Sequence, residues 1–175
     1  CNSGIIAART KDIKKLIPKI NNKNKNGEYY LTDLVKLGSQ ESLRTTMIEV
    51  KEEEVVGINS PLELSIAEEI MQNLLRKKML ENGVKLIDAK TIYFFHDTKI
   101  ARDSIIEPFV VFGPNVEIME ECHIKSFSYL EDCIVENNCH IGPYARIRPG
   151  SKIEKSAKIG NFVEIKNSVV GSNAK

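Results

Sequence analysis

Two cations, Arg148 and Lys166, have a spacing that suits anion binding. They are 18 positions apart, and each directly follows an apolar residue, Ile147 or Ile165. If 18 residues make one turn of a repeating fold, the two side chains stack at the same corner. Cations about 5 Å apart repel each other by roughly 1 kcal/mol in water, and by more in a cleft. A bridging anion would relieve this repulsion, so the pair predicts an anion site; the alternative is a solvated basic edge.

The elements that would position this pair come from a six-residue repeat between residues 100 and 170. An apolar residue returns every six positions, apart from two five-residue steps, and neither the helical nor the strand period fits. This repeat is typical of a parallel β-helix. Three hexads would form one triangular coil of 18 residues, and the coils would stack about 4.8 Å apart. The apolar positions are Ile100, Ile106, Phe112, Ile118, Ile124, Leu130, Val135, Ile141, Ile147, Ile153, Ile159, Ile165 and Val170.

Two other positions of the hexad are also patterned. The residue directly after each apolar position is often Gly or charged, which predicts the turn there. His123 and His140 then fall at exposed hexad ends, where we expect no catalytic role. The fourth position holds small or β-branched residues, expected at an interior corner: Ser104, Val110, Val116, Cys122, Ser128, Ile134, Cys139, Ala145, Ser151, Ala157 and Val163.

Composition excludes several classes of function. The chain has 175 residues and a net charge of +1, so charge predicts neither nucleic-acid binding nor attraction to an anionic membrane. No apolar run is long enough for membrane insertion. The four cysteines match no zinc pattern, and Cys122 and Cys139 are expected to pack inside a protein of a reducing compartment. With no leader visible in CNSGII, we expect a cytoplasmic protein, and without an initiator Met a processed chain or a piece of a longer one.

Residues 1–59 do not repeat and are predicted to form an α/β layer. Strands are expected at residues 5–7 and 46–50, and helices at residues 11–20 and from about Thr32. Such a layer is too short to cover both faces of a sheet. Neither GxGxxG nor GxxxxGK is present, so the first part of a nucleotide-binding domain is expected to be missing.

A long helix is predicted to connect this layer to the repeats. Ser60 is a cap, Pro61 suits the first turn, and Glu63 completes a capping box. Apolar residues follow at four-residue steps, and Gly83 ends the helix. About 22 residues give a rod of about 33 Å.

Several strings in order carry a resemblance to one family. The chain resembles the bifunctional bacterial N-acetylglucosamine-1-phosphate uridylyltransferase and glucosamine-1-phosphate N-acetyltransferase family, as a central segment truncated at both ends. The strings are Asn2-Ser3-Gly4-Ile5, Asn26-Gly27-Glu28-Tyr29-Tyr30-Leu31-Thr32-Asp33, Val56-Gly57-Ile58-Asn59, Gly83-Val84 with Ile87-Asp88, Gly142-Pro143-Tyr144-Ala145-Arg146-Ile147-Arg148-Pro149-Gly150 and Gly160-Asn161-Phe162-Val163-Glu164-Ile165-Lys166.

The resemblance implies three parts. Residues 1–59 would be the end of a Rossmann-like nucleotidyltransferase domain, residues 60–83 a linker helix, and residues 84–175 the first coils of a left-handed β-helix. The left hand comes from the resemblance, since the general crossover rule predicts the right. The family trimerises through this β-helix. It transfers acetyl from acetyl-CoA to glucosamine-1-phosphate and then uridylyl from UTP with Mg²⁺, which makes UDP-N-acetylglucosamine for peptidoglycan and lipopolysaccharide precursors.

The resemblance also implies binding residues. Asn59 matches a Mg²⁺ ligand, and its amide oxygen is a hard donor. The amino-sugar phosphate would meet Arg148 and Lys166. Without the resemblance, the segment from residue 26 to 33 is a loop and a helix cap. The positions that match the sugar-nucleotide pocket are Asn2, Glu28, Tyr30, Thr32 and Asn59.

No catalytic residue is expected in this segment. The family's general-base histidine would follow Lys175, and neither His123 nor His140 occupies its place. The chain alone is therefore predicted to be inactive. Three hypotheses follow: a segment of the bifunctional enzyme or a remnant of its gene, a non-catalytic trimeric β-helix scaffold, and a stand-alone acyltransferase. The last is disfavoured because no base follows Lys166.

Overall fold

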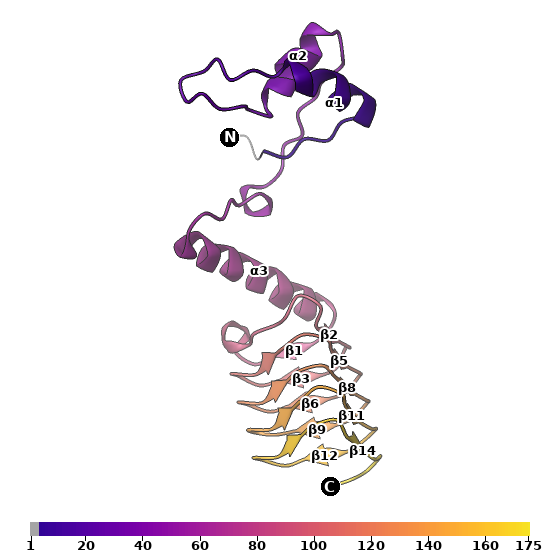
Figure 1. Cartoon of the computed structure of the whole chain (residues 1–175). Helices are drawn as coiled ribbons and strands as arrows, with labels where there is room; N and C mark the ends of the chain where they lie inside the picture. The colour runs from indigo at the N-terminus through magenta and orange to yellow at the C-terminus, as the bar shows by residue number, and fades with distance from the viewer. Residues whose placement is uncertain (1–3) are drawn as a thin grey trace. The chain divides into compact units, whose positions relative to one another are not determined.

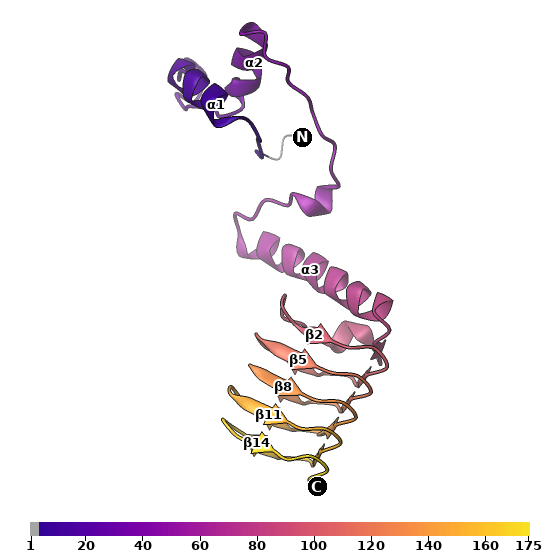
Figure 2. The same ribbon diagram turned by 90° about the vertical axis from the view of Figure 1, so that its right-hand side faces the viewer.

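The computed structural model describes residues 4–175, and the chain divides into two compact units (Figure 1). One unit contains residues up to Ala67, and the other runs from Glu68 to Lys175. Each unit has its own set of elements and is described by itself. The second unit is a parallel β-solenoid of stacked coils, and Figure 2 shows one of its sheets strand by strand.

The first unit is helical, as the apolar spacing predicts for two of its segments. Helix α1 (Thr10–Leu16) continues into the 3₁₀ turn η1 (Ile17–Lys19) where Pro18 enters, and α2 spans Asp33–Gln40. A further 3₁₀ turn, η2, spans Glu52–Glu54. Helices α1 and α2 pack together and bury Leu16 and Leu34, while Lys15 and Lys19 both form ion pairs with Glu41.

The two strands predicted in this unit are wrong. Residues 5–7 and 46–50 are irregular, and no strand forms anywhere between residues 4 and 67. Ile5 is 73% exposed and Ile48 is 80% exposed. A parallel strand depends on hydrogen bonds from neighbouring strands and on cover over both faces. Within the described part of this unit no neighbouring strand exists, so β-branched composition alone does not produce an α/β layer.

The long helix is confirmed as α3 (Pro61–Glu81). The Ser60 hydroxyl accepts the N–H of Glu63 at 3.2 Å, and the Glu63 carboxylate accepts the N–H of Asn59 at 2.7 Å. At its end, Gly83 has φ +84° and Val84 N–H donates to the Met79 carbonyl, which is a Schellman motif. No helix in the described residues is long and apolar enough to cross a bilayer.

The C-terminal half of α3 covers the first coil of the solenoid. Leu75 and Met79 are buried in the same core as the repeat residues. The Gln72 side chain donates to the Phe94 carbonyl at 2.7 Å and accepts the Phe94 N–H at 3.0 Å. Arg76 donates to the carbonyl of Ile92. The helix therefore closes the end of a stack whose first coil would otherwise expose its interior and its backbone.

Three parallel sheets form the sides of the solenoid. After the first coil, consecutive strands along the chain fall in successive sheets. The first coil contains the 3₁₀ turn η3 (Ala89–Thr91) and has only an isolated bridge, Tyr93 with Val111, on its sheet B side. Sheet A contains β1 (Lys85–Leu86), β3 (Ile105–Ile106), β6 (His123–Ile124), β9 (His140–Ile141) and β12 (Lys158–Ile159). Sheet B contains β4 (Val111–Phe112), β7 (Tyr129–Leu130), β10 (Arg146–Ile147) and β13 (Glu164–Ile165). Sheet C contains β2 (Lys99–Ile100), β5 (Val116–Ile118), β8 (Cys133–Val135), β11 (Ser151–Ile153) and β14 (Val169–Val170).

The interior is lined by the six-residue apolar set, as predicted. From Ile100 to Ile159 these residues are at most 7% exposed. Ile147 aligns with Ile165, one 18-residue coil apart, which confirms the predicted stacking. Two fourth-position residues are not buried as predicted: Val163, near the C-terminal end of the stack, is 37% exposed, and Ile134 is 42% exposed, with Cys133 buried in its place. The five-residue step shortens this hexad by one residue, so the alternation of the strand turns Cys133 inward and Ile134 outward.

The turn residue mostly lies three positions after the apolar residue, and Asp132 and Asn167 lie two positions after it, whereas the prediction placed the turn directly after it. Each corner has a residue with positive φ, and Gly142 adds a second at the Tyr144 corner. The left-handed conformation redirects the chain into the next sheet. At the A–B corner these residues are Phe109, Phe127, Tyr144 and Phe162. At the B–C corner they are Asn115, Asp132, Gly150 and Asn167, and at the C–A corner Asp103, Glu121, Asn138, Ser156 and Asn173.

Candidate anion site

Arg148 and Lys166 lie at the end of sheet B, where the chain enters the B–C corner. Arg148 follows β10 and Lys166 follows β13, and these strands pair in parallel with Ile147 opposite Ile165. The N–H of Arg148 donates to the Ile165 carbonyl at 2.8 Å. The two cationic residues therefore occupy the same position of consecutive coils. Both lie at the solvent-facing edge of the sheet.

The structure adds a third member, Glu164. Its carboxylate lies 3.0 Å from Arg148 Nη1, and the two side chains are 52% and 36% exposed. Arg148 is thus partly neutralised, and no ion pair forms at Lys166 within residues 4–175. The sequence analysis missed Glu164 because it compared only the positions that directly follow an apolar repeat residue, such as Lys166 after Ile165. The position directly before the apolar residue also points outward from sheet B, and Glu164 occupies that position before Ile165.

The corner retains one net positive charge and unused donors. Arginine has five N–H donors in a planar fork, and one contact with Glu164 leaves others free. Lys166 adds an ammonium one coil away. A planar fork beside a point charge suits a phosphate group, which can accept from both. Because Glu164 supplies a competing anion, the expected affinity is modest.

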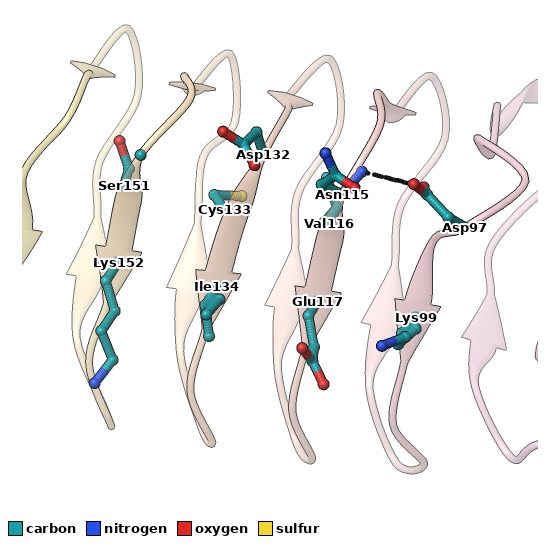
Figure 3. A pocket seen from close by; sticks show the side chains of 11 residues that line it. Asp97, Lys99, Asn115, Val116, Glu117, Asp132, Cys133, Ile134, Ser151 and Lys152 are labelled. Carbon is teal, nitrogen blue, oxygen red and sulfur yellow. Dashed lines mark hydrogen bonds between the residues drawn. The ribbon is translucent and has the colours of Figure 1, made fainter.

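An open groove of about 500 Å³ lies on sheet C beside this corner. Figure 3 shows Lys99, Glu117, Ile134 and Lys152 in a row across its floor, one from each coil. Lys99 and Lys152 are basic, Glu117 is acidic and Ile134 is apolar, and Lys152 already pairs with Glu136 at 2.7 Å. A groove of this composition has no predominant charge to attract an anion.

The groove also lacks an activated nucleophile. Burial raises the pKa of the Cys133 thiol to about 12, so this cysteine stays protonated near neutral pH. Asp97 accepts the backbone N–H of Asn115. Asp97 therefore holds the turn at Asn115, and these groove residues do not suggest a reaction.

The two histidines of the repeats lie on sheet A, in β6 and β9, and not at exposed turns as predicted. They precede the apolar residue, so their rings lie partly buried against the sheet. His123 Nε2 is 2.8 Å from Glu107, and the ring centroids of His123 and His140 are 5.9 Å apart. Sheet A is a different side of the triangle from the Arg148 corner, so neither ring can act on an anion bound there.

The carboxyl group of Glu107 and the imidazole of His140, both on this face, have shifted pKa values. Burial opposes ionisation of Glu107, but Ser126 donates to it from both its N–H and its hydroxyl, and His123 is also bound. These contacts leave the pKa of Glu107 lowered. Burial and the neighbouring charges of His123, Lys158 and Lys125 lower the pKa of His140. Neighbouring groups on sheet A therefore lower the pKa of both residues, but we assign no binding site to this face.

The predicted sugar-nucleotide residues fall in the first unit. Asn2 lies outside the described residues. Glu28 and Tyr30 belong to the loop before α2, which is organised by Asn24: its side-chain oxygen accepts the N–H of Glu28 at 3.2 Å. Tyr30 Oη accepts from the Asn26 amide at 2.8 Å. Thr32 is the N-cap of α2 but forms no side-chain cap bond. Glu28, Tyr30 and Thr32 follow one another in this segment, and their ligand role stays a prediction.

Asn59 does not form a metal site with the residues that the structure describes. No group of three His, Cys, Asp or Glu side chains able to hold a cation is present among residues 4–175. The carboxylate that contacts Asn59 is Glu63, which accepts the backbone N–H of Asn59 and the hydroxyl of Ser60. One amide oxygen is too small a donor set for Mg²⁺, which takes six ligands. The residues present thus do not fit the ion.

Known proteins match both the repeats and the whole chain. A family model described as bacterial transferase hexapeptide (six repeats) matches residues 132–167. The bifunctional protein GlmU of Zymomonas mobilis subsp. mobilis is 43% identical over 175 residues, which is 100% of this chain and 39% of that protein. The GlmU proteins of Paramagnetospirillum magneticum and Azorhizobium caulinodans are 45% and 40% identical over the same shares. The chain thus spans about two fifths of the length of these relatives.

A solved structure also shows a weak similarity. It is the acetyltransferase domain of PglB from Neisseria gonorrhoeae FA1090, with a TM-score of 0.31 and 14% identity over 60% of this chain and 61% of that one. A similarity at this level supports no conclusion. The sequence matches run from end to end, and the six-residue repeat is visible in both sequence and structure. This chain therefore belongs to the family of the bifunctional GlmU proteins and corresponds to a hexapeptide-repeat-containing part of them.

Proposed function

We propose that this chain is part of a bifunctional enzyme that makes UDP-N-acetylglucosamine. The enzyme would transfer acetyl from acetyl-CoA to glucosamine-1-phosphate and then uridylyl from UTP, as in the sequence-based expectation. Similarity to GlmU proteins over all 175 residues of this chain supports the proposal. The structural observation that carries it is the stacking of Arg148 over Lys166, one coil apart at an exposed corner.

The role proposed for this corner is to hold the phosphate of the amino sugar. Arg148 is oriented by Glu164 on one side and can present its remaining N–H groups to a phosphate oxygen. Lys166 can approach a second oxygen from the next coil. The two cationic side chains attract and orient the substrate through its dianionic end. Glu164 can accept a hydrogen bond from a sugar hydroxyl or ammonium.

Acetyl transfer also needs a base, because an ammonium group is not nucleophilic. Within the described residues the two repeat histidines lie on sheet A, on a different side of the solenoid from this corner. The proposal therefore assigns binding to these residues and no turnover to the 175-residue chain by itself. The wider expectations remain part of the proposal: sugar-phosphate ligands, a cytoplasmic protein, and a homotrimer formed through the β-helix.

Titration of the 175-residue chain with glucosamine-1-phosphate tests this role. Backbone NMR should show shifts centred on Arg148 and Lys166, with binding that weakens as salt rises. Arg148→Ala should weaken binding about tenfold, the scale of one charged hydrogen bond. Lys158→Ala is the matched control, because it removes one exposed lysine from sheet A and should change little.

Three results would contradict the proposal. They are shifts confined to sheet A, equal losses in Arg148→Ala and Lys158→Ala, or no saturable binding. The last result would favour a non-catalytic scaffold. Measured acetylation of glucosamine-1-phosphate by the chain alone would contradict the absence of a base.

A further inference from the structure

The chain contains two Asn-Gly pairs, Asn26–Gly27 and Asn82–Gly83. In such a pair the backbone nitrogen of Gly can attack the side-chain carbonyl carbon of Asn, because Gly has no Cβ to hinder the approach. The nitrogen gives up its proton, a cyclic imide forms and ammonia leaves. Water then adds to one carbonyl of the imide and reopens the ring. The net change converts the Asn amide and a water molecule into Asp or isoaspartate and ammonia.

The structure leaves Asn26 and Gly27 open to this reaction. Both residues are exposed in the loop before α2, and a Cβ built on Gly27 would meet nothing within 4 Å. The N–H of Gly27 donates to the Asn24 carbonyl at 3.2 Å, which is the long end of the hydrogen-bond range. The Asn26 amide donates to Tyr30 Oη at 2.8 Å. Since these partners belong to the same loop, the pair can rearrange without opening a buried core.

Asn82 and Gly83, in contrast, are held at the end of α3. The N–H of Gly83 donates to the Leu80 carbonyl at 3.0 Å, and the Gly83 carbonyl accepts the N–H of Asp103 at 3.0 Å. The residue that follows, Val84, is 2% exposed and belongs to the core. Turning the Gly83 nitrogen toward the Asn82 side chain would break the Schellman motif and disturb Val84. The same dipeptide therefore has different access to the same reaction in the two places.

We propose that Asn26 is a site of spontaneous deamidation and that the fold protects Asn82. The product carries a carboxylate in place of the amide that donates to Tyr30, so the loop loses a donor and gains a negative charge. The new charge lies two positions before Glu28, in the segment predicted to hold the sugar nucleotide. It would repel the phosphates of such a ligand. This last consequence rests on the proposed function, whereas the modification itself does not.

Peptide mapping by mass spectrometry tests the modification. The 175-residue chain is incubated at mildly alkaline pH, and the acid forms at both Asn positions are followed over time. Asn26 should convert at least roughly tenfold faster than Asn82, because Asn82 reacts only when the last turn of α3 opens. Conversion of Asn26 should accelerate as pH rises, since base removes the proton of the Gly27 nitrogen. Gly27→Ala should slow the conversion, because the added Cβ hinders the attack.

The chain unfolded in urea is the matched control. Both Asn-Gly pairs are free there, so their rates of conversion should become similar. A difference that persists in urea would show that neighbouring residues, and not the fold, set the order of reaction, and it would overturn the inference. So would a folded chain in which Asn82 converts as fast as Asn26, or in which Asn26 stays an amide while the unfolded chain converts. None of these measurements involves a ligand, so their outcome is independent of the proposed function.

Discussion

Shortening Ile141 to alanine removes side-chain volume from the interior of the solenoid. Ile141 is 0% exposed in β9, between Ile124 in the coil before and Ile159 in the coil after. The change deletes three carbons, each contributing about 0.8 kcal/mol on transfer from water. Neighbouring coils are held by their backbone ladders and cannot collapse fully into the space. With the cavity included, we expect a loss of about 3–4 kcal/mol in the free energy of unfolding.

Ile134→Ala is the matched control. The same three carbons are removed from a strand residue of the same type, but Ile134 points outward and is 42% exposed. The covered part of the side chain contributes about 1 kcal/mol, and no enclosed cavity forms. Any loss of intrinsic strand preference is common to the two changes. The difference of about 2–3 kcal/mol between the variants therefore reports the inward or outward direction of each side chain.

Urea unfolding followed by circular dichroism measures both variants. The slope of the transition should be unchanged, so that the midpoint alone reports stability. Equal losses within about 0.5 kcal/mol, or a larger loss for Ile134→Ala, would refute the assigned register. Ile141→Asp gives a second reading, because a charge in the dry interior costs several kcal/mol and should unfold the surrounding coils.

Four further predictions concern the cap of α3, the Cys133 thiol and the acidity of Glu107 and His140. Ser60→Ala should lower the free energy of unfolding by about 1 kcal/mol and weaken amide protection in the first turn of α3, whereas full protection there would contradict the cap. Peptide mapping should find Cys133 unlabelled by iodoacetamide in the native chain, because its pKa is raised to about 12, and rapid native labelling would show that the thiol is accessible. The lowered pKa of Glu107 stabilises the fold above its ordinary value near 4.5, and this contribution is lost as pH falls through the folded value. Glu107→Gln should therefore be less stable than the wild type at pH 7 and equal to it in acid; a difference that persists in strong acid would count against this account. The lowered pKa of His140 affects stability at a higher pH than Glu107 does. As pH falls below about 6.5, the imidazole of the unfolded chain binds a proton before that of the folded chain, so the fold loses stability. His140→Asn should flatten that part of the pH–stability curve, and an unchanged slope would argue against it.

The sequence alone determined the elements whose patterns are local and periodic. The six-residue return of Ile, Val and Leu identified the β-helix and nearly all of its interior, because burial must recur once per side of the triangle. The capping residues around Ser60 and Gly83 located α3 to within a residue, because caps are satisfied by neighbours in sequence. The separation of Arg148 and Lys166 by one coil followed from the same period.

Only the tertiary structure decided features that depend on contacts between coils or units. The short step after Leu130 reversed Cys133 and Ile134, since register is set by pairing with the adjacent strands. Residues 46–50 form no strand, because strand composition has no effect without a hydrogen-bonding neighbour. Glu164 reaches Arg148 from the next coil, so it neutralises part of a site that sequence spacing describes as purely cationic. The stacked rings at the A–B corner likewise arise from coil packing, which brings together side chains 17 or 18 residues apart: Phe109, Phe127, Tyr144 and Phe162.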